Sequence, residues 1–123
     1  MAYDRRNVFA RILRGELPCK KVCENEHALA FHDIAPLMAV HVLVIPKGEY
    51  ESFVDFSANA SVAEQAGLVQ AIGEAARLCG VAASGYRLIA NSGADAHQEV
   101  PHLHVHIFGG KAIPGRMIKQ EGR

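Results

Sequence analysis

Polar and apolar residues alternate over consecutive positions near the end of the chain, in residues 102–108 (HLHVHIF). A period of two is typical of a β-strand, on which residues i, i+2 and i+4 share one face. The pattern therefore predicts that His102, His104 and His106 line one face of a strand and that the aliphatic residues between them line the other. Because the aliphatic face takes the buried side, we expect the three imidazoles to face a cleft or a second layer.

Two helices are predicted from the periodicity of the remaining chain. A short helix over residues 8–14 would be capped by Asn7. A longer helix over residues 62–79 would begin at the capping box of Ser61 and Glu64. The apolar stripe expected on this helix comprises Val62, Ala66, Val69, Ile72, Ala76 and Cys79.

Four further strands are predicted, over residues 20–24, 27–34, 39–45 and 86–90. Between the third of these and the long helix, residues 47–59 are interpreted as a polar loop with at most one helical turn. The tail from Lys111 onward is expected to be extended or partly mobile. Strands and helices in this order predict an α+β fold with a mostly antiparallel sheet.

Length and composition limit the class of protein. A chain of 123 residues with half of them hydrophobic is expected to form one domain over residues 1–123. Thirteen basic and thirteen acidic residues balance, which argues against nucleic acid as a partner. No apolar run has the length of a membrane helix and no signal peptide is visible. The odd number of cysteines, three, favours a reducing cytoplasm over a disulfide framework.

Three interpretations of the histidines remain open. They could form an exposed strand without chemistry, or they could bind a metal ion. Against a three-ligand metal site, the outer Cα atoms of such a set lie about 13 Å apart, while Zn–N bonds measure about 2.0–2.1 Å. A metal would therefore use His102 and His104, or His104 and His106, together with remote partners.

Nucleophilic catalysis is the third interpretation. An imidazole with its usual pKa of about 6.5 is neutral at pH 7, and it attacks well when its other ring nitrogen is held by an acceptor. Neighbours two residues away lie about 6.7 Å along a strand, so two rings can touch one phosphate, and one of them can donate to phosphoryl oxygens. Gln98 and backbone N–H groups near His97 and Glu99 would be further donors.

The motif His102-x-His104-x-His106 with the Gly109-Gly110 end resembles the histidine-triad (HIT) family of nucleotide hydrolases and transferases. Other blocks resemble the family in the right order and cover nearly the whole chain; they are residues 7–12, 30–34, 41–46, 85–91 and 97–100. The resemblance is closest to the Hint branch, the purine nucleoside phosphoramidases. It implies a HIT fold with a five-stranded antiparallel sheet, one long helix and one short helix, and a homodimer in which two sheets join.

The resemblance also implies an activity. Nucleotidyl transferases of the family carry Gln at the third triad position, where this chain has His106, so hydrolysis of nucleoside 5′-phosphoramidates to AMP or GMP is expected, without cofactor or metal. Two alternatives are kept: hydrolysis of dinucleoside polyphosphates, and a purine-nucleotide-binding regulatory module with little turnover. His97 and Glu99 stand where eukaryotic members tend to have Gly and Ser, which indicates a bacterial-type member.

The resemblance assigns roles to single residues. His104 would be the nucleophile, His106 would contact the phosphate, and His102 would orient the site with His41 behind it. Asp33 would bind the ribose hydroxyls, since a carboxylate accepts from both. The nucleotide-binding set comprises Asp33, Ile34, Phe31, His32, Phe9, Ile12, Leu43, Asn91, Gln98 and Glu99.

Several of these residues have structural interpretations that are equally open. Phe9, Ile12 and Leu43 would be apolar in almost any core, and His41 could be a core histidine. Asp33 and Asn91 could be turn residues. Some bacterial relatives carry a zinc-binding cysteine pair in the first helix; this chain has Asn7 and Ala10 there, so no structural zinc is expected.

Overall fold

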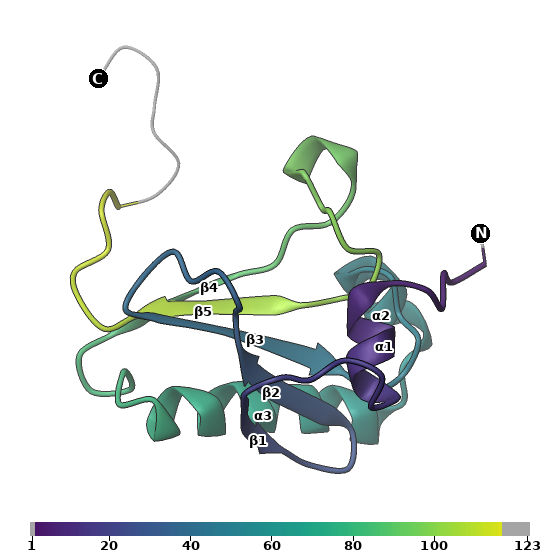
Figure 1. Ribbon diagram of the computed structural model, residues 1–123, viewed down its shortest axis with the longest axis horizontal. Coiled ribbons are helices and arrows are strands. Elements are labelled where there is room, and N and C mark those ends of the chain that lie inside the picture. The colour runs from purple at the N-terminus through teal and green to yellow at the C-terminus, as the bar shows by residue number, and fades with distance from the viewer. Residues whose placement is uncertain (1, 117–123) are drawn as a thin grey trace.

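A five-stranded antiparallel sheet forms the centre of the computed structural model, which describes residues 2–116 (Figure 1). The strands are β1 (Lys21–Glu24), β2 (Ala28–His32), β3 (Val40–Pro46), β4 (Tyr86–Ile89) and β5 (Val105–Gly109). Their order in the sheet is β1-β2-β3-β5-β4. The α+β class and the five antiparallel strands are confirmed, and the histidine-containing strand β5 lies next to the central strand β3.

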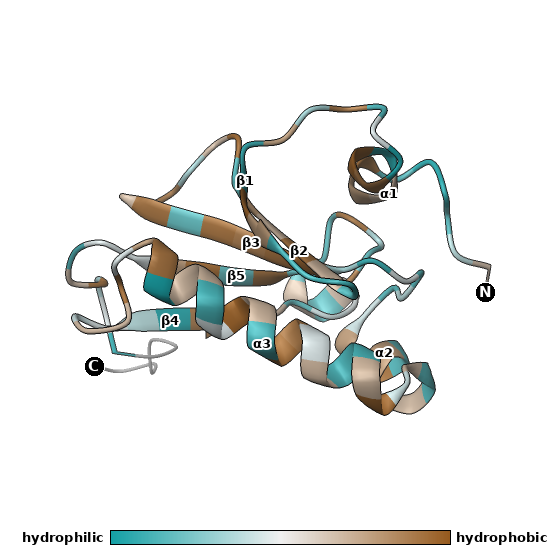
Figure 2. Cartoon of the chain, turned by 90° about the horizontal axis from the view of Figure 1, so that it is seen from below, coloured by the Kyte–Doolittle hydropathy of each residue, from teal (hydrophilic) through white to brown (hydrophobic). Residues whose placement is uncertain are grey.

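Helices cover both faces of the sheet. The helices are α1 (Val8–Leu13), α2 (Phe53–Asn59), α3 (Val62–Leu78) and the short 3-10 helix η1 (Ala94–Ala96). The long helix α3 runs along one face, and α1 lies over the other face (Figure 2). Asn7 caps α1 and Ser61 opens α3 with a full capping box, as the sequence predicts.

Two separate apolar clusters lie on the two faces of the sheet. The cluster beneath α3 joins small and branched residues of the helix to the sheet; it includes Ala28, Ala30, Val42, Val44, Leu68, Ala71, Ala75, Leu103 and Ile107. The cluster beneath α1 is smaller and richer in large side chains, comprising Phe9, Leu29, Phe31, Leu43 and Ile45. The second cluster leaves room at its border for a cavity, which is described below.

The buried face of α3 differs from the predicted stripe. Val62 and Val69 are 83% and 69% exposed, whereas the buried positions are Gly67, Leu68, Ala71, Ala75 and Ala76. The reason is that α3 packs very close to the sheet, because a Cβ added at Gly67 would lie only 2.7 Å from the Cβ of His27. At such a close approach to the sheet, small residues fit and the β-branched valines face outward.

The helix α2 lies within the segment predicted as a polar loop. Ser52 caps it by accepting from the backbone N–H of Asp55, and Phe56 anchors it in the core with 3% exposure. The signal present in the sequence was the spacing of Ser52 and Asp55 before a single apolar anchor. This signal is weaker than a stripe because only one residue of the helix is buried.

The part of the tail that is described runs from Lys111 to Arg116, where the guanidinium of Arg87 on β4 donates to the carbonyl oxygens of Gly115 and Arg116. Residues 117–123, which complete the predicted extended tail, lie outside the described residues. None of the helices between residues 2 and 116 has the length and apolarity needed to cross a membrane.

The close packing of α3 yields a paired prediction on two glycines of the same helix. Gly67→Ala should lower the free energy of unfolding by about 1–3 kcal/mol, because its Cβ would collide with His27. Gly73→Ala should raise it by about 0.5–1 kcal/mol, because its Cβ meets only the end of Arg77 at 3.5 Å and alanine favours a helix. Urea unfolding of both variants measures the two shifts, and equal shifts would contradict the packing described.

Candidate active site

A cavity of about 270 Å³ lies beside α1 at the end of the smaller apolar cluster. It is lined by Phe9, Asp33, Leu43, Asn91, His97, Gln98, Glu99, Val100, His104 and His106. These residues come from α1, β2–β3, the segment after β4 and β5. The structure therefore brings together most of the residues that the sequence selects, from segments far apart in the chain.

One ring nitrogen of His104 is already hydrogen-bonded to the protein backbone. Its Nδ1 lies 2.7 Å from the carbonyl oxygen of His102, and a carbonyl only accepts, so Nδ1 carries the hydrogen. The neutral ring then has its lone pair on Nε2. The ring of Phe9 packs edge-on against it at 4.9 Å, and only 8% of His104 is exposed. The geometry leaves Nε2 as the atom of His104 that can attack or accept in the cavity.

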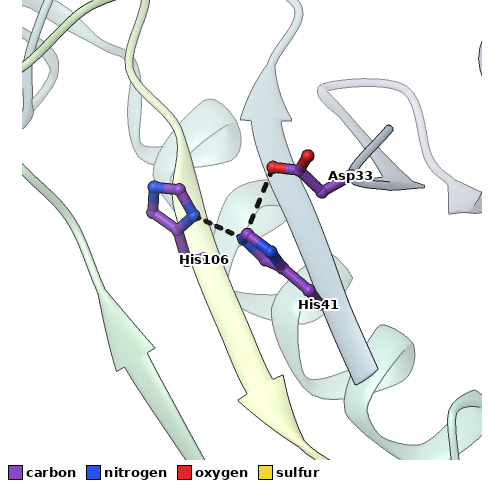
Figure 3. A group of neighbouring side chains, drawn as sticks. All are labelled: Asp33, His41 and His106. Carbon is purple, nitrogen blue, oxygen red and sulfur yellow. Dashed lines mark hydrogen bonds and ion pairs between the residues drawn. The ribbon is translucent and has the colours of Figure 1, made fainter. Parts of the chain in front are cut away.

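His106 is fixed by a second histidine, as Figure 3 shows. The backbone N–H of Leu37 donates to Nδ1 of His41 at 3.1 Å, so the hydrogen of the neutral His41 ring is on Nε2. This Nε2–H donates to Nδ1 of His106 at 2.9 Å. His106 must then carry its own hydrogen on Nε2, which makes it a donor. Facing strands explain the contact, because Leu43 pairs with His106 and His41 with Phe108.

Asp33 completes this group from the end of β2. Its Oδ2 lies 3.4 Å from Nε2 of His41, and its Oδ1 accepts from the backbone N–H of Ala35 at 2.8 Å. The carboxylate is thus held in place, and Asp33 lines the cavity. His41, with 3% exposure, lies behind His106 and not behind His102, which corrects the arrangement expected from the sequence.

Burial keeps the imidazoles of His41, His102 and His106 neutral. Burial lowers the pKa of His106 to about 4, and the neighbouring rings of His104 and His41 lower it further. Burial likewise lowers the pKa of His102 to about 4. The pKa of His41 is also lowered by burial, against the opposing charge of Asp33. At pH 7 the rings therefore hold one hydrogen each, as the hydrogen-bond directions require.

His102 departs from the sequence prediction. Strand β5 begins only at Val105, and the backbone turns at residues 100–102, where the N–H of His102 donates to the carbonyl of Val100. The ring of His102 is fully buried and donates from Nε2 to the carbonyl of Pro46 at 2.9 Å. The three histidines therefore do not share one strand face, although Leu103, Val105 and Ile107 are buried as predicted.

A metal ion has one candidate group among the described residues. One ligand atom each of Asp33, His41 and His106 lie within 4.8 Å of one another, which is not the pair within the triad that the sequence suggested. The Leu37 N–H occupies Nδ1 of His41, so a metal on Nε2 would require that bond to break. The residues fit a hydrogen-bonded relay better than a metal centre.

Gln98 lines the cavity, but its side-chain amide is bonded to the backbone. Its Nε2 donates to the carbonyls of Glu51 at 2.6 Å and Val100 at 3.0 Å, and its Oε1 accepts from the N–H of Gly93. These bonds hold the loop that precedes the triad. A phosphate contact by Gln98 would have to compete with them, so its evident role is to place the loop.

Four residues of the predicted nucleotide-binding set do not line the cavity. Ile34 is fully exposed and His32 is exposed, because both lie where β2 ends and the chain turns. Phe31 is buried in the cluster beneath α1. Ile12 packs against the same cluster and lines a second hollow of about 480 Å³, next to Leu13 and Leu29.

Sequence reasoning did not place two residues of the cavity in the predicted site, His97 and Val100. His97 has a left-handed backbone (φ 58°, ψ 40°), the only non-glycine residue with positive φ in the described range. Its position four residues after the loop glycine Gly93 carries no pattern that marks it. Val100 packs against the cluster beneath α1, which a lone valine between polar residues and a proline does not reveal.

The lowered pKa values predict acid sensitivity of the fold. An unfolded histidine titrates at about pH 6.5, whereas the pKa values of His102 and His106 are about 4 in the folded protein. Between these values the unfolded chain binds more protons, so the free energy of unfolding should fall as the pH is lowered from 6.5 toward 4. His102→Gln, which can still donate to Pro46 but does not titrate there, should reduce this slope. Urea unfolding at steps across this window measures it, and a flat profile in the wild type would contradict the burial argument.

Known proteins match this chain in both sequence and structure. Residues 14–113 match the family model described as the HIT domain. A HIT-like protein of Azospirillum brasilense is 63% identical over 116 residues, which cover 94% of either chain. The solved structure of a HIT family hydrolase from Clostridium thermocellum superposes with a TM-score of 0.83 at 38% identity, covering 94% of this chain and 99% of that chain. For a HIT family hydrolase from Legionella pneumophila the TM-score is 0.79 at 33% identity, with 87% and 95% covered.

The resemblance seen in the sequence and the observed sheet thus agree with matches that span most of the chain. The expected short and long helices are present, with α2 in addition. The chain belongs to the HIT family and is a hydrolase-like protein with the HIT fold.

Proposed function

We propose that this protein hydrolyses nucleoside 5′-phosphoramidates through a covalent nucleotidyl intermediate on His104, as in the Hint branch that its sequence resembles. The observation that carries the proposal is the hydrogen bond from Nδ1–H of His104 to the carbonyl of His102. This bond directs the lone pair of a neutral imidazole to Nε2, the nitrogen that remains for the cavity.

The reaction would proceed in two displacements. In the first, Nε2 of His104 attacks the phosphorus, the P–N bond to the amine breaks, and the amine takes up a proton as it leaves. In the second, water attacks the same phosphorus and gives up a proton, which restores the group that protonated the amine. The bond to Nε2 of His104 breaks, its electron pair returns to the ring, and the nucleoside monophosphate is released. His106 would donate its Nε2–H to a phosphoryl oxygen in both steps, with its tautomer set by His41.

The remaining cavity residues support a nucleotide. Asp33, held by Ala35, would accept from the ribose hydroxyls. Phe9, Leu43 and Val100 give an apolar side for the base, and Asn91 lies among the polar residues of the cavity with Glu99. His97 and Glu99 line the same cavity. In its protonated form, the imidazole of His97 or the carboxyl group of Glu99 would supply the proton taken up by the amine.

Removal of the nucleophile gives the test of this proposal. Purified wild-type protein should release AMP from an adenosine 5′-phosphoramidate, and His104→Ala should lose at least about a thousandfold of that rate, because no other group in the cavity replaces the nucleophile. Release of AMP is followed by chromatography, and mass spectrometry of the acid-quenched protein should detect a nucleotidyl adduct in the wild type only. Unchanged turnover in His104→Ala would end the proposal.

The same preparation distinguishes the alternatives. Faster cleavage of a dinucleoside polyphosphate than of any phosphoramidate would favour that substrate class. Nucleotide affinity that survives His104→Ala, together with negligible wild-type turnover, would favour a binding module. Activity lost to a chelator and restored by zinc would favour the metal interpretation at the group of Asp33, His41 and His106.

We also propose a homodimer joined at β4. The two edges of the sheet differ, because β1 carries the ion pair of Lys21 and Glu24 and an irregular register, features that protect an edge from pairing. Strand β4 instead presents Tyr86 and Leu88, which are 40% and 45% exposed. The cysteines of the described chain are all free thiols, in keeping with the cytoplasmic location that we propose for this dimer.

Charge at the open edge should separate the subunits. Leu88→Glu should shift the sedimentation coefficient from dimer to monomer, because paired edges would place two carboxylates in an apolar contact. Val54→Glu on α2, where the valine is 72% exposed, is the matched control and should remain a dimer. A wild-type protein that sediments as a monomer at micromolar concentration would remove the dimer from the proposal.

A further inference from the structure

A hydrogen-bonded chain links the N-terminal segment to the histidine motif, and the two displacements described above make no use of it. The hydroxyl of Tyr3 contacts Nδ1 of His102, a residue 99 positions further along the chain. The two rings meet edge to face, with centroids 5.6 Å apart and planes at 71°. Tyr3 is half-buried, whereas His102 is fully buried.

The direction of this hydrogen bond follows from the partners of His102. Its Nε2 lies 2.9 Å from the carbonyl oxygen of Pro46, which only accepts, so the single hydrogen of the neutral ring is on Nε2. Nδ1 is then an acceptor and Tyr3 must donate to it. Burial raises the pKa of Tyr3, so the phenol keeps its proton at neutral pH and remains a donor.

Asn7 fixes the orientation of the phenol. Its side-chain Nδ2 donates to the oxygen of Tyr3 at 2.8 Å and to the carbonyl of Asp4 at 2.7 Å. Its Oδ1 accepts from the N–H of Ala10 as the N-cap of α1. With one hydrogen of Asn7 already on the Tyr3 oxygen, the proton of the phenol is left for His102. The N-cap of α1, Tyr3 and His102 thus form one hydrogen-bonded unit.

We propose that Tyr3 is a positioning residue for the nucleophile. By donating to Nδ1 of His102 it holds the residue whose carbonyl oxygen fixes the Nδ1–H of His104 at 2.7 Å. Both nitrogens of the His102 ring are then bonded, so the buried ring cannot turn and its backbone stays in place. This role rests on the proposed function, because it matters for catalysis only if His104 attacks phosphorus.

Tyr3→Phe tests the proposal, because it removes the hydroxyl and keeps the ring that packs on His102. On protein labelled with ¹⁵N, the Nδ1 signal of His102 should move toward that of a ring nitrogen without a donor, and the ring signals of His104 should broaden. With an adenosine phosphoramidate, kcat should fall about tenfold, the effect of one lost hydrogen bond. KM should stay within about twofold, because Tyr3 does not line the cavity.

Tyr50→Phe is the matched control, because it removes a phenol hydroxyl that is bonded only to Glu64. It should leave the histidine signals and kcat unchanged, and thermal unfolding of both variants records any loss of stability. Unchanged His102 signals in Tyr3→Phe would overturn the proposal, and so would changed signals with wild-type kcat. If the wild type hydrolyses no phosphoramidate, the proposed function fails, while the signals of His102 and His104 still decide whether Tyr3 holds this pair.

Discussion

A neutral imidazole has one hydrogen and one lone pair, and this constraint organises the site. The hydrogen-bond partner of the ring nitrogen that faces the protein determines whether the nitrogen that faces the cavity carries a hydrogen or a lone pair. The carbonyl of His102 takes the hydrogen of His104 and leaves a lone pair for the cavity. For His106 the result is the reverse. The backbone N–H of Leu37 bonds Nδ1 of His41, and Nε2–H of His41 bonds Nδ1 of His106, so the hydrogen of His106 is on its Nε2. A ring with a free lone pair and a ring with a free hydrogen therefore lie side by side, with centroids 5.1 Å apart, although both are histidines.

This division of roles depends on burial as much as on hydrogen bonds. An imidazolium has hydrogens on both nitrogens, so protonation would remove the lone pair and with it the distinction between the rings. Burial lowers the pKa of His106 to about 4 and also lowers that of His41. The apolar cluster beneath α1 thus contributes to the chemistry, because it forms the low-polarity surroundings in which a single tautomer persists.

The parts of the fold and the site that depend on a local sequence pattern could be predicted from the sequence. Alternation placed Leu103, Val105 and Ile107 in the core, and the capping box of Ser61 located the start of α3. The motif at residues 102–106 and the ordered blocks around it identified the family, which the comparisons support.

The sequence predictions that were wrong concern contacts between segments far apart in the chain. Alternation cannot show that the backbone turns at residues 100–102, because that turn is made with Val100 and fixed by the carbonyl of Pro46 from another strand. Periodicity cannot show how near α3 approaches the sheet, and that distance selects Gly67 and Ala71 for the buried face in place of Val69. The sequence also could not show that His41 bonds His106, because this contact depends on the register between β3 and β5, in which Leu43 pairs with His106.

The arrangement of the sheet explains why the site forms on only one of its faces. On the face beneath α3, small residues let helix and sheet meet closely, and the resulting core includes Ala28, Ala30, Ala71 and Ala75 with little exposure. On the other face α1 has only six residues and covers the sheet only in part. The border left open by this short helix is where Phe9, Leu43 and His104 meet the loop after β4. Because α1 also carries Asn7, the same helix that bounds the cavity is bonded through Tyr3 to the backbone that orients His104.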